Sequence, residues 1–469
     1  MPSREAGRHV TPPTSIFKAC DIRGVVGNEL NADVARKIGR ALATMVAGSS
    51  GGPVCLAGDF RRSTPPLLQA LTAGLVAGGA VVKVLGQVPT PVVYFAAARL
   101  GCQNAVMVTA SHNPGRYNGV KFMVAGQPAV PELVRQLQSL LDAPPVNCEV
   151  GRAEAVDVLG QYETGVRAAA AEVAGSEECL LARRRLTIVV DAMGGAMFEI
   201  APRVLAAAGC QVVPLRCAVD PDFARQDPNP AVDANLAELS RRVVAQQADF
   251  GVALDGDGDR AGLVDSAGRI VRPEQMGAVL IQRCFPRPVL VYDLKCSSIL
   301  ARAARDAGGS SLMQPSGHGF LKTAMIRLQA DLGVEVSGHY FFRALGGGDD
   351  ALFVALLTAH LIARDGLSLA ELVEPIGWPA ITPDLRIPLA GDAAAILEQI
   401  ATHCGGEVSR MDGVRTQYDD GWALARPSIT EPLITLRFEA HERAALRQVA
   451  ARFLKSVPDF SRQVLEMLR

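Results

Sequence analysis

Short apolar runs alternate along most of the chain with glycine-rich polar loops and longer alanine- and leucine-rich stretches. Strands that alternate with helices in this way form βαβ units and largely parallel sheets. We expect strands at residues 54–56, 81–85, 105–108, 187–190, 250–254 and 289–292. In parallel sheets ligands gather at the carboxyl ends of the strands, and most of the unusual polar clusters in this chain follow such ends.

The pattern changes after Pro375, Pro379 and Pro383. Apolar and polar residues then alternate, as at 434–438, which is typical of an antiparallel sheet with one buried face. We therefore predict three similar α/β domains with mixed, largely parallel sheets, followed by a smaller C-terminal α+β domain. The expected limits of the four domains are 1–155, 156–267, 268–375 and 376–469.

Composition narrows the possible functions. The 469 residues are 49% hydrophobic and 20% charged, as in ordinary soluble proteins. A formal net charge of −1 gives no overall field to attract nucleic acid or an anionic membrane. The N-terminus has no apolar signal core, and the ten cysteines include no CxxC pair, so we expect reduced core cysteines. These features predict a cytoplasmic protein without nucleic-acid or membrane partners.

The most informative segment is VMVTASHNPGRYNGVKF at 106–122. Ser111 directly follows an expected strand, and the histidine, asparagine, proline and glycine after it predict a tight, exposed turn. The segment lacks the G-x-S-x-G spacing of a hydrolase nucleophile. A serine in such a loop can carry a phosphoryl group, whose charge near −2 requires a cationic partner. A serine that only closes the turn is the alternative.

The segment VALDGDGDRAG places Asp255, Asp257 and Asp259 two residues apart. Glycines between them allow a turned backbone that directs all three carboxylates to one point. Three hard oxygen ligands suit Mg²⁺, and three close carboxylates without a cation would repel one another. The segment fails as an EF-hand, because Arg260 and Ser266 stand where glycine and glutamate are needed. A solvated acidic turn is the alternative.

The segment EVSGHYFF combines a carboxylate, a hydroxyl and an imidazole at alternate positions, in Glu335, Ser337 and His339. These side chains face one way if the backbone is extended. Together they suit hydrogen bonds to the hydroxyl groups of a sugar. A half-buried strand with one polar face is the structural alternative.

The segment RPSITEP repeats this alternation near the C-terminus, in Arg426, Ser428 and Thr430. A guanidinium fork flanked by hydroxyl groups matches the geometry of a phosphate group. The segment therefore predicts a phosphate clamp, with an ordinary surface turn as the alternative.

Weaker signals lie elsewhere. Arg23 precedes a glycine in FKACDIRGVVG and would approach a phosphoserine, whereas DFRRSTPP at 59–66 is interpreted as structural. His318 lies between glycines in SGHGFLK, which lacks the glycine spacing of a P-loop. Seven of the 47 basic residues are lysines. Four of these lie in or beside the polar motifs: Lys18, Lys121, Lys295 and Lys322.

Together these segments resemble the motifs of the α-D-phosphohexomutase superfamily, and within it of the bacterial phosphomannomutase/phosphoglucomutase group. TASHNP with YNGVK, DGDGDR, EVSGH and RPSITEP occur in the same order and cover nearly the whole chain. The resemblance implies four domains around one central cleft, with one Mg²⁺ per chain. The implied catalytic residues are Ser111 as phosphoryl carrier, with Arg23, Lys121 and His318 as candidate acid–base groups. The implied metal ligands are Ser111, Asp255, Asp257 and Asp259. The implied substrate-binding residues are Arg260, Lys295, Glu335, Ser337, His339, Arg426, Ser428 and Thr430.

The chain departs from the pattern of this group at three positions. Cys20 replaces a tyrosine, Val334 replaces the glycine before the sugar-binding glutamate, and Ile429 replaces an asparagine in the phosphate segment. These changes bear on sugar preference and turnover more than on reaction class. The segment SGHYFF favours mannose or glucose phosphates over glucosamine phosphate.

The implied reaction interconverts hexose 1-phosphate and hexose 6-phosphate. Phospho-Ser111 phosphorylates a hexose 1-phosphate, the hexose 1,6-bisphosphate turns over within the cleft, and its other phosphate returns to Ser111. We expect hexose phosphates as small-molecule partners, the 1,6-bisphosphate as activator, and a monomer or weak homo-oligomer. A phosphoglucosamine mutase, a metal-dependent sugar phosphatase and a non-catalytic sugar-phosphate-binding protein are the alternatives.

Overall fold

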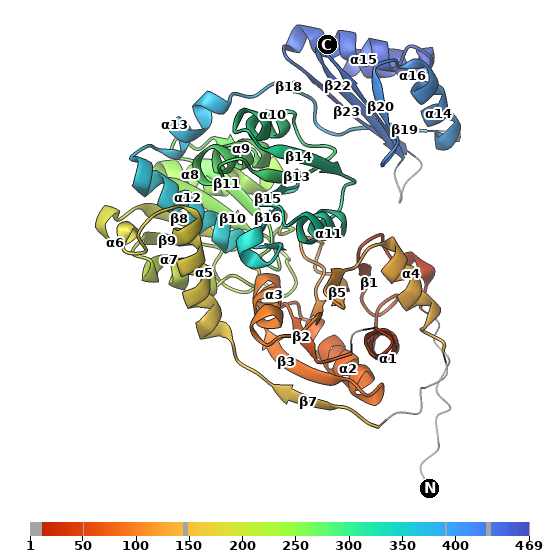
Figure 1. Cartoon of the computed structure of the whole chain (residues 1–469), viewed down its shortest axis with the longest axis vertical. Coiled ribbons are helices and arrows are strands. Elements are labelled where there is room, and N and C mark those ends of the chain that lie inside the picture. The colour runs from red at the N-terminus through yellow and green to blue at the C-terminus, as the bar shows by residue number, and fades with distance from the viewer. Residues whose placement is uncertain (1–11, 50, 144–148, 390–391, 428–432, 469) are drawn as a thin grey trace.

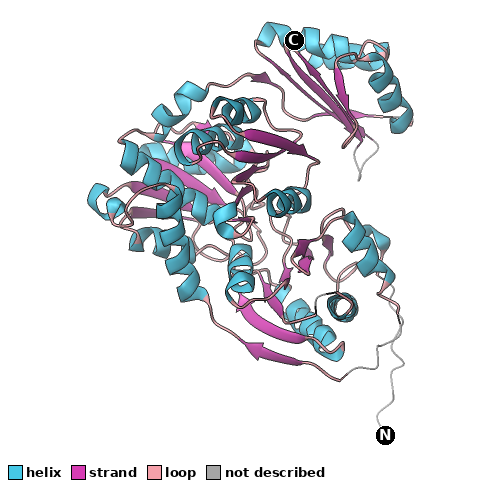
Figure 2. Cartoon of the chain, in the orientation of Figure 1, coloured by secondary structure: helices cyan, strands magenta, loops and turns pink. Residues whose placement is uncertain are grey.

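The computed structural model describes residues 12–49, 51–143, 149–389, 392–427 and 433–468. These residues form four consecutive units, each a β-sheet covered by helices (Figures 1 and 2). The first three sheets mix parallel and antiparallel strands, and the fourth is antiparallel. The predicted fold class, three α/β units followed by a C-terminal α+β unit, is confirmed.

The first unit contains a seven-stranded sheet in the order β1-β5-β4-β2-β3-β7, with β6 paired to β5. Its strands are β1 (Ile22–Val25), β2 (Val54–Gly58), β3 (Val81–Gln87), β4 (Asn104–Val108), β5 (Tyr117–Val124), β6 (Gln127–Pro128) and β7 (Arg152–Ala155). Its helices are η1 (Thr14–Ile16), α1 (Ala32–Ala47), α2 (Thr64–Ala77), α3 (Thr90–Arg99) and α4 (Pro131–Ser139). Because β2 and β4 are parallel neighbours, they end at the same edge of the sheet.

The second unit has a five-stranded sheet in the order β12-β11-β10-β8-β9. Its strands are β8 (Thr187–Asp191), β9 (Gln211–Leu215), β10 (Phe250–Leu254), β11 (Ala261–Asp265) and β12 (Ile270–Val271). The helices before and within it are α5 (Leu159–Val173), α6 (Leu180–Arg184), α7 (Ile200–Ala207) and α8 (Asp233–Ala245).

The third unit has a five-stranded sheet in the order β14-β13-β15-β16-β17. Its strands are β13 (Val289–Asp293), β14 (Ser310–Gln314), β15 (Leu332–Val334), β16 (Tyr340–Phe342) and β17 (Gly348–Asp349). Its helices are α9 (Pro273–Cys284), α10 (Ile299–Asp306), α11 (His318–Leu328), η2 (Arg343–Leu345), α12 (Ala351–Asp365), α13 (Leu369–Val373) and η3 (Glu374–Ile376).

The fourth unit has a six-stranded sheet in the order β18-β23-β22-β21-β20, with β19 also paired to β23. Its strands are β18 (Ala380–Ile381), β19 (Leu385–Pro388), β20 (Glu407–Ser409), β21 (Val414–Tyr418), β22 (Gly421–Pro427) and β23 (Leu433–Ala440). Its helices are α14 (Ala393–His403), α15 (Arg443–Phe453) and α16 (Pro458–Met467). The alternating segment at 434–438 lies in β23, as predicted, and all six strands predicted earlier in the chain are present.

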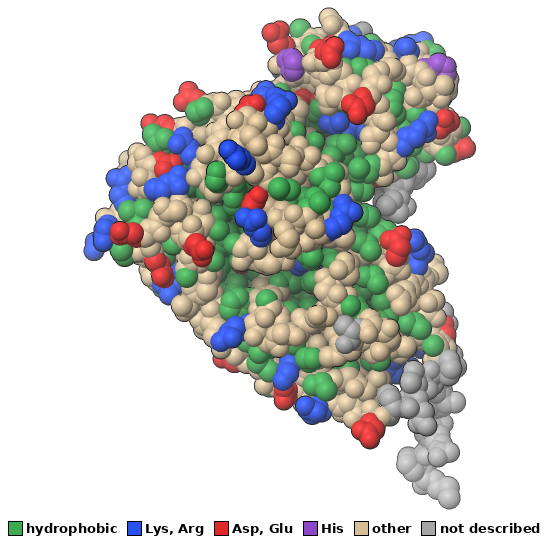
Figure 3. All heavy atoms as spheres, in the orientation of Figure 1, with side chains coloured by type: hydrophobic (Ala, Val, Ile, Leu, Met, Phe, Trp, Pro, Cys, Tyr) green, Lys and Arg blue, Asp and Glu red, His purple; other side chains and the backbone are tan. Residues whose placement is uncertain are grey.

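The apolar cores set the fourth unit apart from the other three, which contain further cores of their own besides the one that they share. One continuous core runs through the first three units, from Cys55 to Ile376, and α12 lies almost wholly within it. The fourth unit has its own core beneath α14, α15 and α16. A small cluster of Leu294, Trp422 and Leu424 joins this unit to the third. The first three units therefore share one core, whereas the fourth unit contacts the third through this cluster and through polar contacts such as Ser298 with Glu439. Figure 3 shows the surface hollowed between the fourth unit and the first.

The length and apolar composition of a helix determine whether it could cross a membrane. Within the described ranges, no single helix is long and apolar enough to cross a membrane. Only α12 and the residues 369–376 reach that length and composition, and they do so as a pair bent by 93°.

Candidate active site

Ser111 lies at the carboxyl edge of the first sheet, three residues after β4, and is fully buried. Its φ of +50° is in the left-handed region, which is unfavourable for a residue with a Cβ. This backbone directs its Oγ toward the second unit, where the hydroxyl donates to Asp255 Oδ2 at 2.7 Å. Gly256 permits this approach, because a Cβ there would lie 2.3 Å from the Ser111 carbonyl oxygen.

The guanidinium of Arg61 fixes the conformation of the serine loop by hydrogen bonds to its backbone. Arg61 follows β2, is 1% exposed, and is paired with Asp59 through its Nε at 3.1 Å. Its four other N–H groups donate to backbone carbonyls of the serine loop, at 2.6–3.1 Å, in Ser111, Asn113, Pro114 and Tyr117. All five donors of the side chain are therefore used. The segment at 59–66 is structural, as interpreted from the sequence, but its structural task is to shape the loop that carries Ser111.

The three aspartates predicted to bind metal converge on one point after β10. Their carboxylates offer oxygen atoms that all lie within 4.8 Å of one another. Asp255 Oδ1 is fixed by the backbone N–H groups of residues 258, 259 and 260 at 3.0–3.1 Å. Asp257 Oδ1 and Asp259 Oδ1 are buried and have no hydrogen-bond partner among the described residues. Buried carboxylate oxygens left unpaired around one point fit a hard divalent cation such as Mg²⁺.

Lys121 of β5 supplies the positive charge nearest to this cluster. Its Nζ lies 2.8 Å from Asp257 Oδ2 and 2.5 Å from Asp259 Oδ2. Although burial opposes it, these carboxylates hold the pKa of the Lys121 ammonium well above its ordinary value. Burial and the two neighbouring carboxylates raise the pKa of Asp255 to about 8. Three buried carboxyl groups thus lie beside one ammonium group, that of Lys121.

The predicted sugar-binding segment is a tight turn, so the expected alternation along an extended strand is wrong. β15 ends at Val334, and Glu335 and Gly338 close the turn before β16, with Gly338 N–H donating to the Glu335 carbonyl at 3.0 Å. Gly338 takes a φ of +95°, which an extended strand does not allow. The turn still brings two of the predicted groups together, since Ser337 Oγ donates to Glu335 Oε1 at 2.8 Å. Glu335 Oε2 is buried and without a partner among the described residues.

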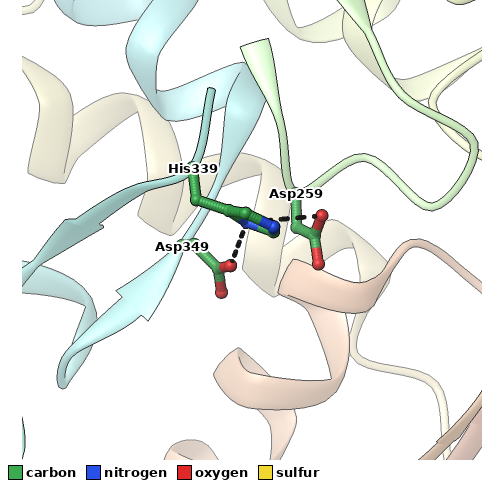
Figure 4. A group of neighbouring side chains, drawn as sticks. All are labelled: Asp259, His339 and Asp349. Carbon is green, nitrogen blue, oxygen red and sulfur yellow. Dashed lines mark ion pairs between the residues drawn. The ribbon is translucent and has the colours of Figure 1, made fainter. Parts of the chain in front are cut away.

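His339 joins the sugar-binding turn to the metal loop (Figure 4). Arg260 Nε donates to His339 Nε2 at 2.8 Å, so that ring nitrogen must accept and the proton resides on Nδ1. His339 Nδ1 faces Asp349 Oδ2 at 2.7 Å and Asp259 Oδ1 at 3.6 Å. The three side chains drawn in Figure 4 lie close enough to surround a metal ion, but a protonated Nδ1 is not a ligand. We therefore interpret them as an aspartate–histidine pair beside the metal site.

Sequence reasoning identified His318 as a site residue but assigned no role to Lys322, one turn later on α11. The two rings of His318 and His339 are tilted, with centroids 6.2 Å apart. Lys322 is 2% exposed, and its Nζ lies 2.8 Å from the centroid of the Tyr94 ring. Burial lowers the pKa of Lys322 to about 7 and that of His318 to about 4. The scarcity of lysine in the sequence was the available signal for Lys322.

Arg23 reaches the serine loop, as the sequence predicts. It is paired with Asp21 at 2.5 Å, and its Nη1 donates to Asn113 Oδ1 at 2.6 Å. Cys20, the departure from tyrosine, is buried against the start of α11, where a Cβ on Gly319 would lie 3.0 Å from its Sγ. The first and third units thus touch beside the site.

Two other cations predicted to bind substrate, Lys295 and Arg426, are paired with carboxylates of the fourth unit. Lys295, directly after β13, has its Nζ 3.1 Å from Asp384 Oδ2. Arg426 of β22 has its Nη2 2.7 Å from Asp412 Oδ2. The remaining predicted members of the clamp, Ser428 and Thr430, and the departure at Ile429 lie outside the described residues.

Comparison with known proteins gives this geometry its context. Models of the phosphoglucomutase/phosphomannomutase family match the chain in order: α/β/α domain I at 14–144, domain II at 173–268, domain III at 272–376 and the C-terminal domain at 385–456. The chain belongs to the phosphoglucomutase/phosphomannomutase family.

Relatives support this assignment over nearly the whole length. A phosphomannomutase/phosphoglucomutase of Pseudomonas aeruginosa is 35% identical over 451 residues, covering 94% of this chain and 95% of the relative. A phosphoglucomutase of Neisseria gonorrhoeae is 33% identical, covering 93% and 95%. A solved family protein from Burkholderia thailandensis is 35% identical, with a TM-score of 0.85 and coverage of 96% and 98%. The predicted superfamily, and with it a phosphohexomutase that acts as an isomerase by phosphoryl transfer, is confirmed.

The contacts of Arg61 predict that replacing it affects stability and activity much more than replacing its neighbour Arg62. Lysine at position 61 retains the charge but offers at most three donors, so at least two of the five buried acceptors lose their hydrogen bond to this side chain, at about 1–3 kcal/mol for each one left unpaired. Arg61→Lys should lower the thermal unfolding midpoint and kcat. Arg62→Lys is the matched control, because Arg62 is paired with Asp222 on the surface and should tolerate the change. Equal midpoints for the two variants would contradict the account.

The buried Lys322 predicts a stability effect that depends on pH. Because its pKa is lowered to about 7, the unfolded chain binds one proton more than the folded protein between about pH 7 and pH 10. Its destabilising effect is therefore fully present at and below pH 7 and is lost as pH rises toward 10. Lys322→Met should stabilise the protein by about 2 kcal/mol more at pH 7 than at pH 9.

Thermal unfolding midpoints at the two pH values provide the measurement. Lys455→Met is the control, because Lys455 is exposed and its replacement should give the same small shift at both pH values. A shift for Lys322→Met that does not change between pH 7 and pH 9 would show that the Lys322 ammonium is not perturbed.

Proposed function

We propose that this phosphohexomutase interconverts the 1-phosphates and 6-phosphates of mannose, glucose or both, with Ser111 as phosphoryl carrier. The observation that best supports this role is the hydrogen bond from Ser111 Oγ to Asp255 Oδ2, which places the hydroxyl at the edge of the aspartate cluster. In the first half-reaction the P–O bond to Ser111 breaks as a bond forms to O6 of the hexose 1-phosphate. In the second half-reaction the phosphoryl group on O1 returns to Ser111.

The proposed metal ligands are Ser111 in its phosphorylated form, Asp255, Asp257 and Asp259. When bound, one Mg²⁺ per chain would offset the negative charge of the transferring phosphoryl group. Lys121 contributes a fixed positive charge at the same place, because Asp257 and Asp259 keep it protonated. When Ser111 accepts the phosphoryl group, its proton has an acceptor at hydrogen-bond distance in Asp255 Oδ2.

The three acid–base candidates differ in what they can do. Arg23 stays protonated and is proposed to orient the loop and the phosphoserine. Lys121 is held as an ammonium by its carboxylate partners. His318 is neutral at pH 7, since its pKa is lowered to about 4, and we propose it as the acceptor of the proton from the attacking sugar hydroxyl.

The sugar is proposed to bind between two parts of the molecule. Glu335, Ser337 and His339 read the ring hydroxyls, and the unpaired Oε2 of Glu335 supports this role. Arg260 and Lys295 contact the ligand from the second and third units, and a clamp in the fourth unit holds the distal phosphate: Arg426, Ser428 and Thr430. Because the fourth unit has a separate core, it can close over the ligand and open to let the bisphosphate turn.

The other parts of the proposal are those expected from the sequence. We propose four domains, with limits at 1–155, 156–267, 268–375 and 376–469. We also propose a cytoplasmic location, hexose 1,6-bisphosphate as activator, and a monomer or weak homo-oligomer. The names of the relatives favour mannose and glucose over glucosamine phosphate. A phosphatase would release inorganic phosphate, and a non-catalytic relative would bind without turnover.

Coupled isomerisation of mannose 1-phosphate and glucose 1-phosphate, with Mg²⁺ and the matching 1,6-bisphosphate, tests this function. We expect both 6-phosphates to appear, without inorganic phosphate, and Ser111→Ala to lose at least about 1,000-fold in kcat because the covalent route is removed. Ser49→Ala, at an exposed serine, is the control and should retain full activity.

Removal of Mg²⁺ with a chelator should abolish turnover, and added Mg²⁺ should restore it. Inorganic phosphate in place of the isomer, or full activity of the Ser111→Ala variant, would refute the proposal. Parallel kcat/KM values for the glucose, mannose and glucosamine phosphates would decide the sugar.

A further inference from the structure

A cavity of about 720 Å³ lies between the second, third and fourth units. Lys295, Ser337, Asp384 and Arg437 are among its lining residues. It thus contains two residues already proposed to bind substrate, Lys295 and Ser337, and two to which no role has been assigned. Asp384 and Arg437 are therefore candidates for a further role in this cavity.

The carboxylate of Asp384 lies between two cations. Its Oδ2 is 3.1 Å from Lys295 Nζ, and its Oδ1 is 3.8 Å from Arg437 Nη1. Arg437 is 8% exposed, and its Nε is buried without a hydrogen-bond partner among the described residues. Its other ionic neighbour, Glu274, is also 3.8 Å away. Asp384 is thus hydrogen-bonded to Lys295 but makes only a longer ionic contact with Arg437, so the two cations form an anion site that one carboxylate does not saturate.

The two sides of this site belong to different bodies. Lys295 follows β13 in the third unit, whereas Asp384 lies between β18 and β19 in the fourth. Thr382, two residues earlier, exchanges hydrogen bonds with Phe438 of β23, at 2.9 Å and 3.0 Å. Asp384 is therefore tied to the sheet of the fourth unit, and its ion pair with Lys295 links that unit to the third.

The proposed clamp shows a similar arrangement on the same face of the fourth sheet, because the register of β22 and β23 places Arg426 and Arg437 on one face. Arg426 is paired with Asp412 at 2.7 Å, and its Nε is buried without a partner among the described residues. Lys295 and Arg426, which the proposed function assigns to ligand binding, are thus both held by carboxylates of the fourth unit. A phosphate group, with up to two negative charges and three terminal oxygens, is the ligand that competes best with a single carboxylate for such cations.

We propose that Asp384 is an internal anion that occupies Lys295 in the free enzyme and is displaced by the phosphate of the substrate. This inference rests on the proposed function, because it takes Lys295 as a substrate-binding residue. Displacement exchanges one ion pair for another, so Asp384 weakens the apparent affinity for hexose phosphate. Displacement also removes one of the contacts between the third and fourth units when the ligand arrives, while the contact between Arg437 and Glu274 remains.

The test is ligand binding by full-length protein that cannot turn over. In the Ser111→Ala background, isothermal titration measures the Kd of glucose 6-phosphate and of inorganic phosphate. Asp384→Asn removes the competing charge and should lower both Kd values about three- to tenfold, as expected for a partly exposed ion pair. Asp420→Asn is the control, because Asp420 forms a comparable pair with Arg452 elsewhere in the fourth unit and should leave both values unchanged.

A double variant separates competition from a general change of charge. In Lys295→Ala, the further change Asp384→Asn should have no effect on Kd, because the shared cation is absent. Equal tightening in both backgrounds, no tightening in the Lys295-containing protein, or weaker binding after Asp384→Asn would each overturn the inference. So would a protein that binds neither probe.

The result of the binding test does not depend on whether the enzyme isomerises hexose phosphates. A protein that binds glucose 6-phosphate more tightly after Asp384→Asn, yet whose parent with Ser111 shows no isomerisation, would retain the internal anion and refute the proposed reaction. A protein that isomerises hexose phosphates, yet whose Kd ignores Asp384, would retain the reaction and refute the internal anion.

Discussion

The buried guanidinium of Arg61 holds the serine loop in a conformation that the loop's own backbone resists. Ser111 takes a left-handed φ of +50°, which is unfavourable by about 1–2 kcal/mol for a residue with a side chain. Four hydrogen bonds from Arg61 to loop carbonyls, and the ion pair with Asp59, compensate for this strain. The consequence is functional, since only this backbone directs Ser111 Oγ toward Asp255 in the next unit.

Once the serine is in place, the site is governed by buried charge. Asp255, Asp257 and Asp259 lie together with Lys121 as the nearest cation, and phosphorylation of Ser111 would add nearly two negative charges. A divalent cation and the positive side chains around the cleft are needed to stabilise that state. In the free protein two of those side chains, Lys295 and Arg426, form ion pairs with internal carboxylates. Ligand binding is then an exchange of anions, for which a fourth unit with its own core is suited.

The sequence predicted those parts of the fold and site that are encoded locally. Ser111 and the three aspartates stand in contiguous motifs directly after buried strands, so their neighbours in the chain were sufficient to assign them. Arg61 was not assigned, because its partners lie 50 to 56 positions away and only the folded loop brings them to it. Asp349 was missed because only the pairing of β16 with β17 brings it to His339, and Lys322 because burial against Tyr94 leaves no local pattern. The segment at 335–339 is a turn and not the extended backbone on which its side chains would face one way, since Gly338 permits a turn that side-chain alternation does not reveal.

The central claim is that a phosphoryl group travels on Ser111, and a single-turnover experiment tests it most directly. Full-length protein labelled with radioactive phosphate at Ser111, confirmed by peptide mass spectrometry, is mixed with one equivalent of unlabelled glucose 1-phosphate and quenched within milliseconds to seconds. The account predicts that label leaves Ser111 and appears in glucose 1,6-bisphosphate and then in glucose 6-phosphate. Label that stays on the protein, or that appears only as inorganic phosphate, would contradict it.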